Sequence, residues 1–325
     1  MTSAAFDVLG IGNAIVDVIS RADDAFLAQH ALTKGSMMLI DEARAEKLYA
    51  AMGSAIEVSG GSCGNTMAGV ASFGGKGAYI GKVRNDQLGS VFGHDLKAIG
   101  VSFDTTPATA GPATARCLIT VTPDAQRTMS TYLGACTGLG PNDIDTKLVG
   151  SAQVTYVEGY LWDAPEAKKA VLKAFDAAHA EGRLVSITMS DSFCVDRYRD
   201  EFRALIRDKV DILFGNEAEI KSLYQVDSFD QAAEAVRKEA KIAALTRSEK
   251  GSVVIKGSET HVVPAAPVSK IVDTTGAGDL YASGFLHGFT HGKPLAECAR
   301  LGGIAAAEII SHVGARPETP LKGLV

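Results

Sequence analysis

Short apolar, β-branched runs alternate with longer helix-like segments along most of this chain. That alternation is typical of a parallel α/β sheet, because parallel strands need crossover connections that helices usually supply. The expected strands are Val8–Ile11, Ala78–Gly81, Val154–Glu158, Val185–Thr188, Ile212–Phe214, Ile242–Thr246 and Val253–Ile255. The expected helices are Gly64–Phe73, Pro165–Glu181, Tyr198–Arg207, Glu217–Tyr224 and Phe229–Glu239. A chain of 325 residues can bury a large core of this kind.

Two segments interrupt the alternation. Residues 14–40 and about 103–135 have the pattern of short strands joined by turns. We expect these segments to pair as a small β-sheet that forms a discontinuous lid over the carboxyl ends of the main strands, where ligands bind in open α/β sheets. With no repeat or long linker, the chain is expected to form a single domain over residues 1–325.

Charge and composition exclude several classes of partner. Lys and Arg number 32 against 38 Asp and Glu, a net charge of -6 without a long basic run, which argues against nucleic acid. No stretch approaches 18 uninterrupted apolar residues, so no membrane span is expected. The first residues lack a signal-peptide pattern, and five scattered cysteines suggest free thiols in a reducing compartment. We therefore expect a cytoplasmic protein.

The clearest chemical signal is the stretch Asp273-Thr274-Thr275-Gly276-Ala277-Gly278-Asp279. Its glycines let successive backbone N–H groups converge on one point. The following run has apolar residues at helical spacing, which places the turn at a helix N-terminus, where an anion is favoured. Asp279 could take a proton from an attacking hydroxyl, so the stretch suggests phosphoryl transfer. A tight turn with an acidic N-cap is the alternative interpretation.

A second glycine-rich region, Ser59–Asn65, also precedes a helical run. Adjacent glycines allow close approach of a ligand, and Asn65 can donate to and accept from a hydroxyl. Asp17 lies in an apolar stretch and needs a partner, which could be a sugar diol, a backbone amide or a lysine. Gly10-Ile11-Gly12 only half matches a dinucleotide fingerprint, so a nicotinamide-dependent dehydrogenase is a weak alternative.

Polar residues also follow two of the later strands. Asn216 and Glu219 form a capping-box pattern, and they could instead hold hydrated Mg²⁺ near nucleotide phosphates. Thr246 to Gly251 could line a nucleotide site or could be only a hairpin loop. A Walker A loop and a His-Glu-x-x-His zinc motif are both missing from the sequence.

These motifs together resemble the PfkB/ribokinase family of sugar and nucleoside kinases. Asp273–Asp279 is similar to that family's Asp-Thr-x-Gly-Ala-Gly-Asp signature, and Gly60–Gly81 is similar to its amino-terminal glycine-rich signature. Asn216-x-x-Glu219 resembles its Mg²⁺/phosphate motif. Within the family, Gly12–Asp17 and Gly60–Asn65 are most similar to the adenosine kinases. The resemblance implies a ribokinase-like three-layer α/β/α fold, with a mostly parallel central sheet and a small β-sheet lid.

The resemblance also implies an activity: ATP-dependent phosphorylation of the 5′-hydroxyl of adenosine to give AMP and ADP, in purine salvage. A kinase of another nucleoside, or of a sugar such as ribose or fructose, is the first alternative. A non-catalytic nucleotide-binding regulator is a remote one. The implied cofactors are Mg²⁺ with ATP, and K⁺ in some relatives, beside Asp273–Thr275 and His312–Ala315. The partners are small molecules, and the chain could be a monomer or a homodimer.

The same resemblance assigns roles to individual residues. The expected catalytic residues are Asp279, Gly276, Ala277, Gly278 and Arg127. The expected acceptor-binding residues are Asn13, Asp17, Gly60, Gly61, Ser62 and Asn65. The expected nucleotide-binding residues are Asn216, Thr246, Ser248, Gly251 and Gly278, with Asn216 and Glu219 expected to hold Mg²⁺ through water. Aromatic residues around Gly159–Trp162 would flank the purine.

Overall fold

A nine-stranded, mostly parallel sheet forms the centre of the computed structural model, which describes residues 4–124 and 126–325. Residues 1–3, on which the expectation about a signal peptide partly depends, and Ala125, in the second expected lid segment, lie outside the described residues. In spatial order the strands are β14 (Glu259–Val263), β13 (Ser252–Lys256), β12 (Ile242–Thr246), β11 (Ile212–Asn216), β10 (Leu184–Thr188), β9 (Ala152–Glu158), β1 (Phe6–Ile11), β5 (Gly77–Ile80) and β6 (Val101–Phe103). Only the β12–β13 and β13–β14 pairs of this sheet are antiparallel.

Helices cover both faces of this sheet. Successive side chains of β1 alternate between the two layers: Val8 belongs to one buried cluster and Leu9 to the other. One face is covered by α3 (Ser62–Ser72), α4 (Gln87–Ala98), α10 (Ala277–Thr290) and α11 (Leu295–Ile309). The opposite face is covered by α5 (Thr146–Gly150), α6 (Pro165–Ala180), α7 (Ser192–Asp208), α8 (Glu217–Tyr224) and α9 (Phe229–Glu239). The expected three-layer α/β/α fold is confirmed.

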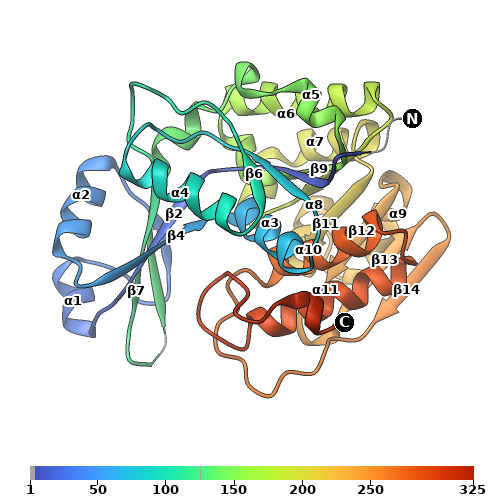
Figure 1. The fold of residues 1–325 in the computed structure, drawn as a ribbon. Helices are drawn as coiled ribbons and strands as arrows, with labels where there is room; N and C mark the ends of the chain where they lie inside the picture. The colour runs from blue at the N-terminus through green and yellow to red at the C-terminus, as the bar shows by residue number, and fades with distance from the viewer. Residues whose placement is uncertain (1–3, 125) are drawn as a thin grey trace.

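A second, five-stranded sheet lies beside the central one, and with α1 and α2 it projects to one side of the molecule (Figure 1). Its strands, in spatial order, are β3 (Met37–Leu39), β8 (Arg127–Tyr132), β7 (Ala115–Val121), β2 (Ile15–Arg21) and β4 (Ala55–Gly60). The sheet is mixed, because β2 pairs parallel with β7 and β3 pairs parallel with β8, whereas the other pairs are antiparallel. We call it the small sheet.

The small sheet differs in detail from the sequence-based expectation. The stretch 14–40 is not all strand and turn, because α1 occupies Asp24–Gln29 and Asp23 caps it by accepting a hydrogen bond from the Phe26 amide. Helix α2 (Glu42–Ala51), capped by Asp41, and strand β4 were not predicted. Both caps are short Asp signals that a strand-and-turn interpretation overlooks. Strand β6, at the edge of the second segment, pairs with β5 in the central sheet.

The expected strands of the central sheet are confirmed to within two residues at each end, and β14 was not predicted. Helix α7 begins six residues earlier than expected, because Asp191 caps it by accepting from the Cys194 amide. Its backbone departs from helical geometry at Tyr198, the residue where the prediction began. The five cysteines are free and buried. Within the described residues, no helix has the length and apolar character needed to cross a membrane.

Candidate active site

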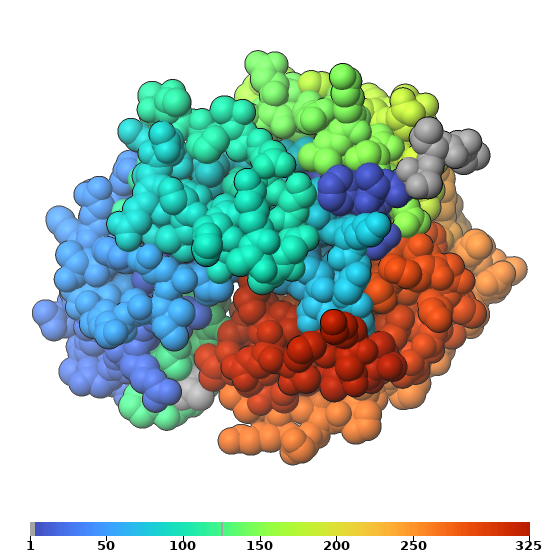
Figure 2. Space-filling model, in the orientation of Figure 1, coloured from blue at the N-terminus to red at the C-terminus, as the bar shows by residue number. Residues whose placement is uncertain are grey.

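A cavity of about 1400 Å³ opens at the carboxyl ends of the parallel strands, between the central sheet and the small sheet. The residues at those strand ends that line it are Asn13, Glu158, Thr188, Asn216 and Thr246. A single small ligand usually occupies roughly 300–1,000 Å³, so the cavity has room for two. Figure 2 shows how the amino-terminal segments of the small sheet (blue) lie against the carboxyl-terminal segments (red) on one side of the molecule.

Residues predicted from separate motifs meet in this cavity. The sequence-predicted residues that line it are Asn13, Asp17, Gly61, Ser62, Asn65, Arg127, Asn216, Glu219, Thr246, Ser248, Gly251, Gly276, Ala277, Gly278 and Asp279. Gly60 does not line it; a Cβ at Gly60 would lie 2.4 Å from the carboxyl carbon of Asp17. Gly60 therefore makes room for a cavity carboxylate instead of facing the cavity.

The glycine-rich turn before α10 presents a helix N-terminus to the cavity. Gly276 is the N-cap, with φ +78°, and it has no side chain to bond the first turn. A Cβ at Gly276 would lie 3.0 Å from the Cβ of Ala315, whereas a Cβ at Gly278 would meet nothing within 4 Å. The first turn is thus packed against the protein at Gly276 and open at Gly278. An uncapped N-terminus with this opening suits an anion.

Asp279, in the first turn of α10, is held by two side chains of α3. Its Oδ1 accepts from Ser62 Oγ at 2.6 Å, and its Oδ2 accepts from Asn65 Nδ2 at 3.0 Å. Burial raises the pKa of Asp279, and these two hydrogen bonds act against the rise. The Asn65 Oδ1 atom is buried and has no hydrogen-bond partner among the described residues. That oxygen is an acceptor that a ligand hydroxyl could satisfy beside the carboxylate of Asp279.

Two other carboxylates share the inner end of the cavity. Burial raises the pKa of Asp17 to about 6, against the opposing charges of Arg316 and Arg127. Glu158 is 1% exposed; it accepts from the Asn13 amide at 2.9 Å and from the Cys63 amide at 2.8 Å. Burial raises the pKa of Glu158 to about 7. Sequence reasoning missed Glu158, although a carboxylate that ends a buried strand was the available signal.

Asn216 and Glu219 form the expected capping box at the start of α8. Asn216 Oδ1 accepts from the Glu219 amide at 2.9 Å, and Glu219 Oε2 accepts from the Asn216 amide at 2.9 Å. Both residues also line the cavity, so the structural role does not exclude a ligand-binding one. Burial raises the pKa of Glu219 to about 7. Within the described residues no group of three or more His, Cys, Asp or Glu side chains could hold a metal ion.

The raised pKa of Glu219 predicts a pH-dependent stability effect. The ordinary value is 4.5 and the folded value is about 7, so folding favours the protonated acid, and the wild type loses this stability as pH rises from about 4.5 through 7. We expect Glu219→Gln to become more stable relative to wild type across that window, by on the order of 1–3 kcal/mol at pH 8. Thermal unfolding at pH 5 and pH 8, without divalent cations, measures the difference.

Glu217→Gln is the matched control for this prediction. Glu217 lies on the same helix, and its hydrogen bond from Arg247 lowers its pKa. Its replacement should therefore not gain stability as pH rises. A Glu219→Gln variant whose stability relative to wild type fell between pH 5 and pH 8 would contradict the assignment of a raised pKa.

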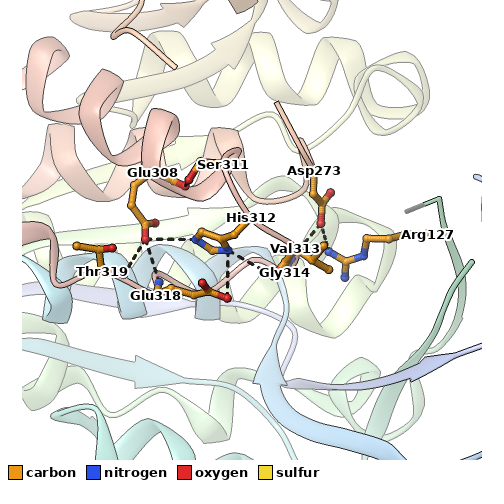
Figure 3. Close-up of polar contacts among 9 residues, drawn as sticks. All are labelled: Arg127, Asp273, Glu308, Ser311, His312, Val313, Gly314, Glu318 and Thr319. Carbon is orange, nitrogen blue, oxygen red and sulfur yellow. Dashed lines mark hydrogen bonds and ion pairs between the residues drawn. The ribbon is translucent and has the colours of Figure 1, made fainter. Parts of the chain in front are cut away.

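Arg127, from β8 of the small sheet, forms an ion pair with Asp273 just before the glycine-rich turn (Figure 3). The same carboxylate accepts from the Gly314 amide at 3.0 Å and, through its other oxygen, from the Thr275 amide at 3.0 Å. Both oxygens of Asp273 are thus bonded within the chain, and a K⁺ site beside it stays a prediction. The Arg127 Nε is buried without a partner among the described residues, so this side chain has donor capacity left for a ligand.

The segment Ser311–Thr319, which we call the carboxyl-terminal segment, is anchored to the end of α11. Glu308 Oε1 accepts from the Glu318 amide at 3.0 Å and from the Thr319 amide at 2.8 Å. His312 Nε2 lies 3.2 Å from the same oxygen (Figure 3). These contacts fold the segment back so that Gly314 and Ala315 reach the glycine-rich turn.

The small sheet contributes an apolar wall to the cavity, beside the Asp17, Cys117, Arg127 and Thr131 side chains that line the cavity from the same sheet. The apolar lining side chains are Ile15, Met37, Leu39, Ile119, Met129 and Leu133, with Phe193 of α7 nearby along the rim. Of the aromatic residues expected near a base, Tyr160 lines the cavity. Trp162 instead packs in the core against Phe202 and donates to Glu201 at 2.9 Å. The hairpin between β12 and β13 brings Thr246, Ser248 and Gly251 to the same cavity.

Known proteins are similar to this chain in sequence and in fold. A model of the pfkB family of carbohydrate kinases matches residues 33–322. A solved probable sugar kinase from Rhizobium etli is 54% identical, with a TM-score of 0.91, covering 99% of this chain and 98% of its own. A solved adenosine kinase from Sinorhizobium meliloti is 53% identical, with the same TM-score and coverage. Adenosine kinase 1 of Arabidopsis thaliana is 27% identical over 98% of this chain and 99% of its own length.

Proposed function

Because this chain belongs to the pfkB family of carbohydrate kinases, which are phosphotransferases acting on a hydroxyl group, we propose that it transfers the γ-phosphoryl group of ATP to the 5′-hydroxyl of adenosine. The products are AMP and ADP, and the proposed setting is purine salvage in the cytoplasm. The observation that carries the choice of a nucleoside over a bare sugar is the apolar wall of the small sheet. A purine has two apolar faces to bury there, whereas a free sugar has none of that size.

We propose that the cavity holds the acceptor and ATP together, with the acceptor hydroxyl in line with the γ-phosphoryl group. The acceptor end has Asn13, Asp17 and Asn65, whose carboxylate and amide groups suit ribose hydroxyls. The nucleotide end has the β12–β13 hairpin and Asn216. In this proposal Asp279 and the N-terminus of α10, which line the same cavity, lie between the two substrates. We propose that the small sheet acts as a lid that excludes water, which would compete with the 5′-hydroxyl as nucleophile.

Asp279 is the general base in the proposed step. The 5′-oxygen attacks the γ-phosphorus and Asp279 takes the hydroxyl proton, while the bond from the γ-phosphorus to the β–γ bridging oxygen breaks and ADP leaves. Ser62 and Asn65 hold the carboxylate of Asp279 so that an oxygen lone pair faces the acceptor. A base with a raised pKa accepts a proton more readily than an ordinary aspartate does. We therefore expect kcat/KM to fall at acid pH, as Asp279 becomes protonated.

Negative charge on the transferring group is stabilised by the first turn of α10 and by Arg127 in this proposal. The backbone N–H groups of Gly276 to Asp279 supply fixed dipoles, and the open space beside Gly278 allows a phosphoryl group to approach them. Arg127 adds a positive charge from the small sheet, so lid closure and charge stabilisation are coupled through one side chain.

The residues present fit Mg²⁺ bound with ATP. Glu219 is 5% exposed, lines the cavity and forms no ion pair with a Lys, Arg or His side chain in the part of the chain that the structure describes. Such a carboxylate suits a nearby cation, and two protein oxygen groups suffice because Mg²⁺ usually keeps water and phosphate ligands. Asn216 and Glu219 would hold it, through water; when bound, the ion neutralises charge on the phosphate oxygens.

The apolar wall gives a prediction about acceptor selectivity. Met37 is 50% exposed and lines the cavity, so Met37→Ser should cost little stability. We expect it to raise the KM for adenosine about tenfold, because losing about 1.4 kcal/mol of apolar contact changes affinity by that factor. The KM for ribose, which has no base, should not change if ribose is turned over. Ile56→Ser is the control, since Ile56 is 68% exposed on the same sheet and does not line the cavity. Equal effects of both variants would contradict the assigned base site.

Steady-state kinetics test the proposed function directly. With Mg²⁺ and ATP, purified protein should give a kcat/KM for adenosine well above those for inosine, ribose and fructose. A preference for ribose or fructose would instead support the sugar-kinase alternative, which the similarity to a probable sugar kinase keeps open. Binding of adenosine and ATP without turnover would support a regulatory protein.

A further inference from the structure

Arg316, in the carboxyl-terminal segment, reaches the turn that joins β4 to α3. Its Nε donates to the Ser59 carbonyl at 2.8 Å, and its Nη1 donates to the Gly64 carbonyl at 2.6 Å. Its Nη2 donates to the Ser59 carbonyl and, at 2.9 Å, to Ser59 Oγ. All three nitrogens of the guanidinium are thus used on one turn. Arg316 is not among the described residues that line the cavity.

The N-terminus of α3 in that turn has no side-chain cap of its own. Gly61 is the N-cap of α3, with φ +79°, and it offers no side-chain cap. A Cβ at Gly61 would lie 2.5 Å from the Asn13 carbonyl oxygen, so the position excludes a capping side chain. The planar fork of Arg316 binds carbonyls on both sides of Gly61, at Ser59 and Gly64. The Ser59 amide in turn donates to Asp95 Oδ2 at 2.7 Å.

The same turn sets the position of the proposed base. Ser62 and Asn65, just after Gly61, hold the carboxylate of Asp279. Arg316 also places a positive charge behind the cavity carboxylates. The titratable groups that face its guanidinium are Asp17 of β2, Tyr79 of β5, Asp95 of α4 and Asp279 of α10. Its charge opposes the effect of burial on Asp17 and Asp279, favouring their ionised forms.

We propose that Arg316 is a positioning residue for phosphoryl transfer: it fixes the Ser59–Gly64 turn so that Ser62 and Asn65 align Asp279 with the acceptor, and it places a positive charge behind Asp17 and Asp279. This inference rests on the proposed function. The carboxyl-terminal segment would then take part in the reaction, although the Arg316 side chain does not line the cavity.

The test compares Arg316→Gln and Arg316→Lys with wild type by kcat, KM and the pH dependence of kcat/KM. Arg316→Gln should lower kcat/KM for the acceptor by roughly 10²-fold, as a small misplacement of reacting groups does. The acid limb of the pH profile of kcat/KM should also move to higher pH by roughly one unit, because the positive charge that favours the ionised carboxylates is lost. Arg316→Lys keeps the charge without the fork, so it should restore the position of the acid limb and leave kcat low. The KM for ATP should stay unchanged.

Arg300→Gln, an exposed arginine of α11 paired with Glu297, is the control and should match wild type. A merely structural role for Arg316 would lower the folded fraction without moving the acid limb, and that result would overturn the inference. If Arg316→Gln does not fold, Arg316→Lys decides: wild-type kcat in that variant would also overturn it. If wild type itself phosphorylates none of the acceptors, the proposed function fails. If wild type is active and Arg316→Gln has the same activity, only the inference about Arg316 fails.

Discussion

Replacing Asp279 with Asn is expected to lower kcat by roughly 10²-fold or more, the scale of a lost general base. The amide has nearly the shape of the carboxylate and can still accept from Ser62 or Asn65, so the fold should remain. ATP affinity should also remain, because the change removes a proton acceptor and leaves the backbone N–H groups of the turn in place. Steady-state kinetics with adenosine, and calorimetric titration with ATP, measure the two quantities separately.

Asp230→Asn is the control for this variant. Asp230 lies in the first turn of α9, at a place in its helix like that of Asp279 in α10, but its side chain is exposed. Its replacement therefore shows how the loss of a first-turn negative charge alone changes stability. The Asp230 variant should keep wild-type kcat. A near-normal kcat in Asp279→Asn would remove Asp279 from the role of base.

Adding one methyl group at Gly278 is expected to separate activity from stability. The new Cβ meets nothing within 4 Å in the protein, and alanine favours a helix more than glycine does. The free energy of unfolding should therefore stay the same or rise by about 0.5–1 kcal/mol. In the proposed reaction the methyl occupies the space through which the phosphoryl group approaches the helix N-terminus. We expect kcat/KM to fall by roughly 10²-fold, since a displacement of about 1 Å can cost that much.

Gly276→Ala provides the contrast for the Gly278 variant. Gly276 has φ +78°, and its Cβ would press on Ala315 at 3.0 Å, so this substitution should cost about 1–2 kcal/mol of stability. Chemical denaturation should therefore show a lower free energy of unfolding than wild type for Gly276→Ala and an equal or higher one for Gly278→Ala. Unchanged kcat/KM in a stable Gly278→Ala variant would mean that no ligand approaches the first turn of α10.

Local patterns in the sequence were enough to predict much of this molecule. The capping box of Asn216 and Glu219 depends on residues three apart, and it forms as expected. The central strands are apolar on both faces, so their pattern is unambiguous. Helices α1 and α2 were harder, because a short helix with a single Asp cap has little periodicity to detect.

Contacts between distant residues could not be predicted in the same way. Nothing near Arg316 in the sequence indicates that it binds the carbonyls of Ser59 and Gly64, more than 250 residues away. The ion pair of Arg127 with Asp273 is equally remote. Gly60 and Gly61 are adjacent and look equivalent in the sequence. In the structure, Gly60 makes room for Asp17, whereas Gly61 occupies the N-cap position of α3. Tertiary packing, which no local pattern contains, decides such cases.

The hydrogen bonds from Ser62 and Asn65 to Asp279 join parts of the chain that are synthesised far apart in time. A nascent chain that ends before residue 273 already contains the proposed acceptor-binding residues and the Asn216–Glu219 pair, but it lacks the proposed base, Asp279, and the helix that carries it. In the proposed reaction such an intermediate has no proton acceptor for the attacking hydroxyl. The proposed reaction therefore requires the last part of the chain, in which α10 packs against α3 and α11 packs against α10.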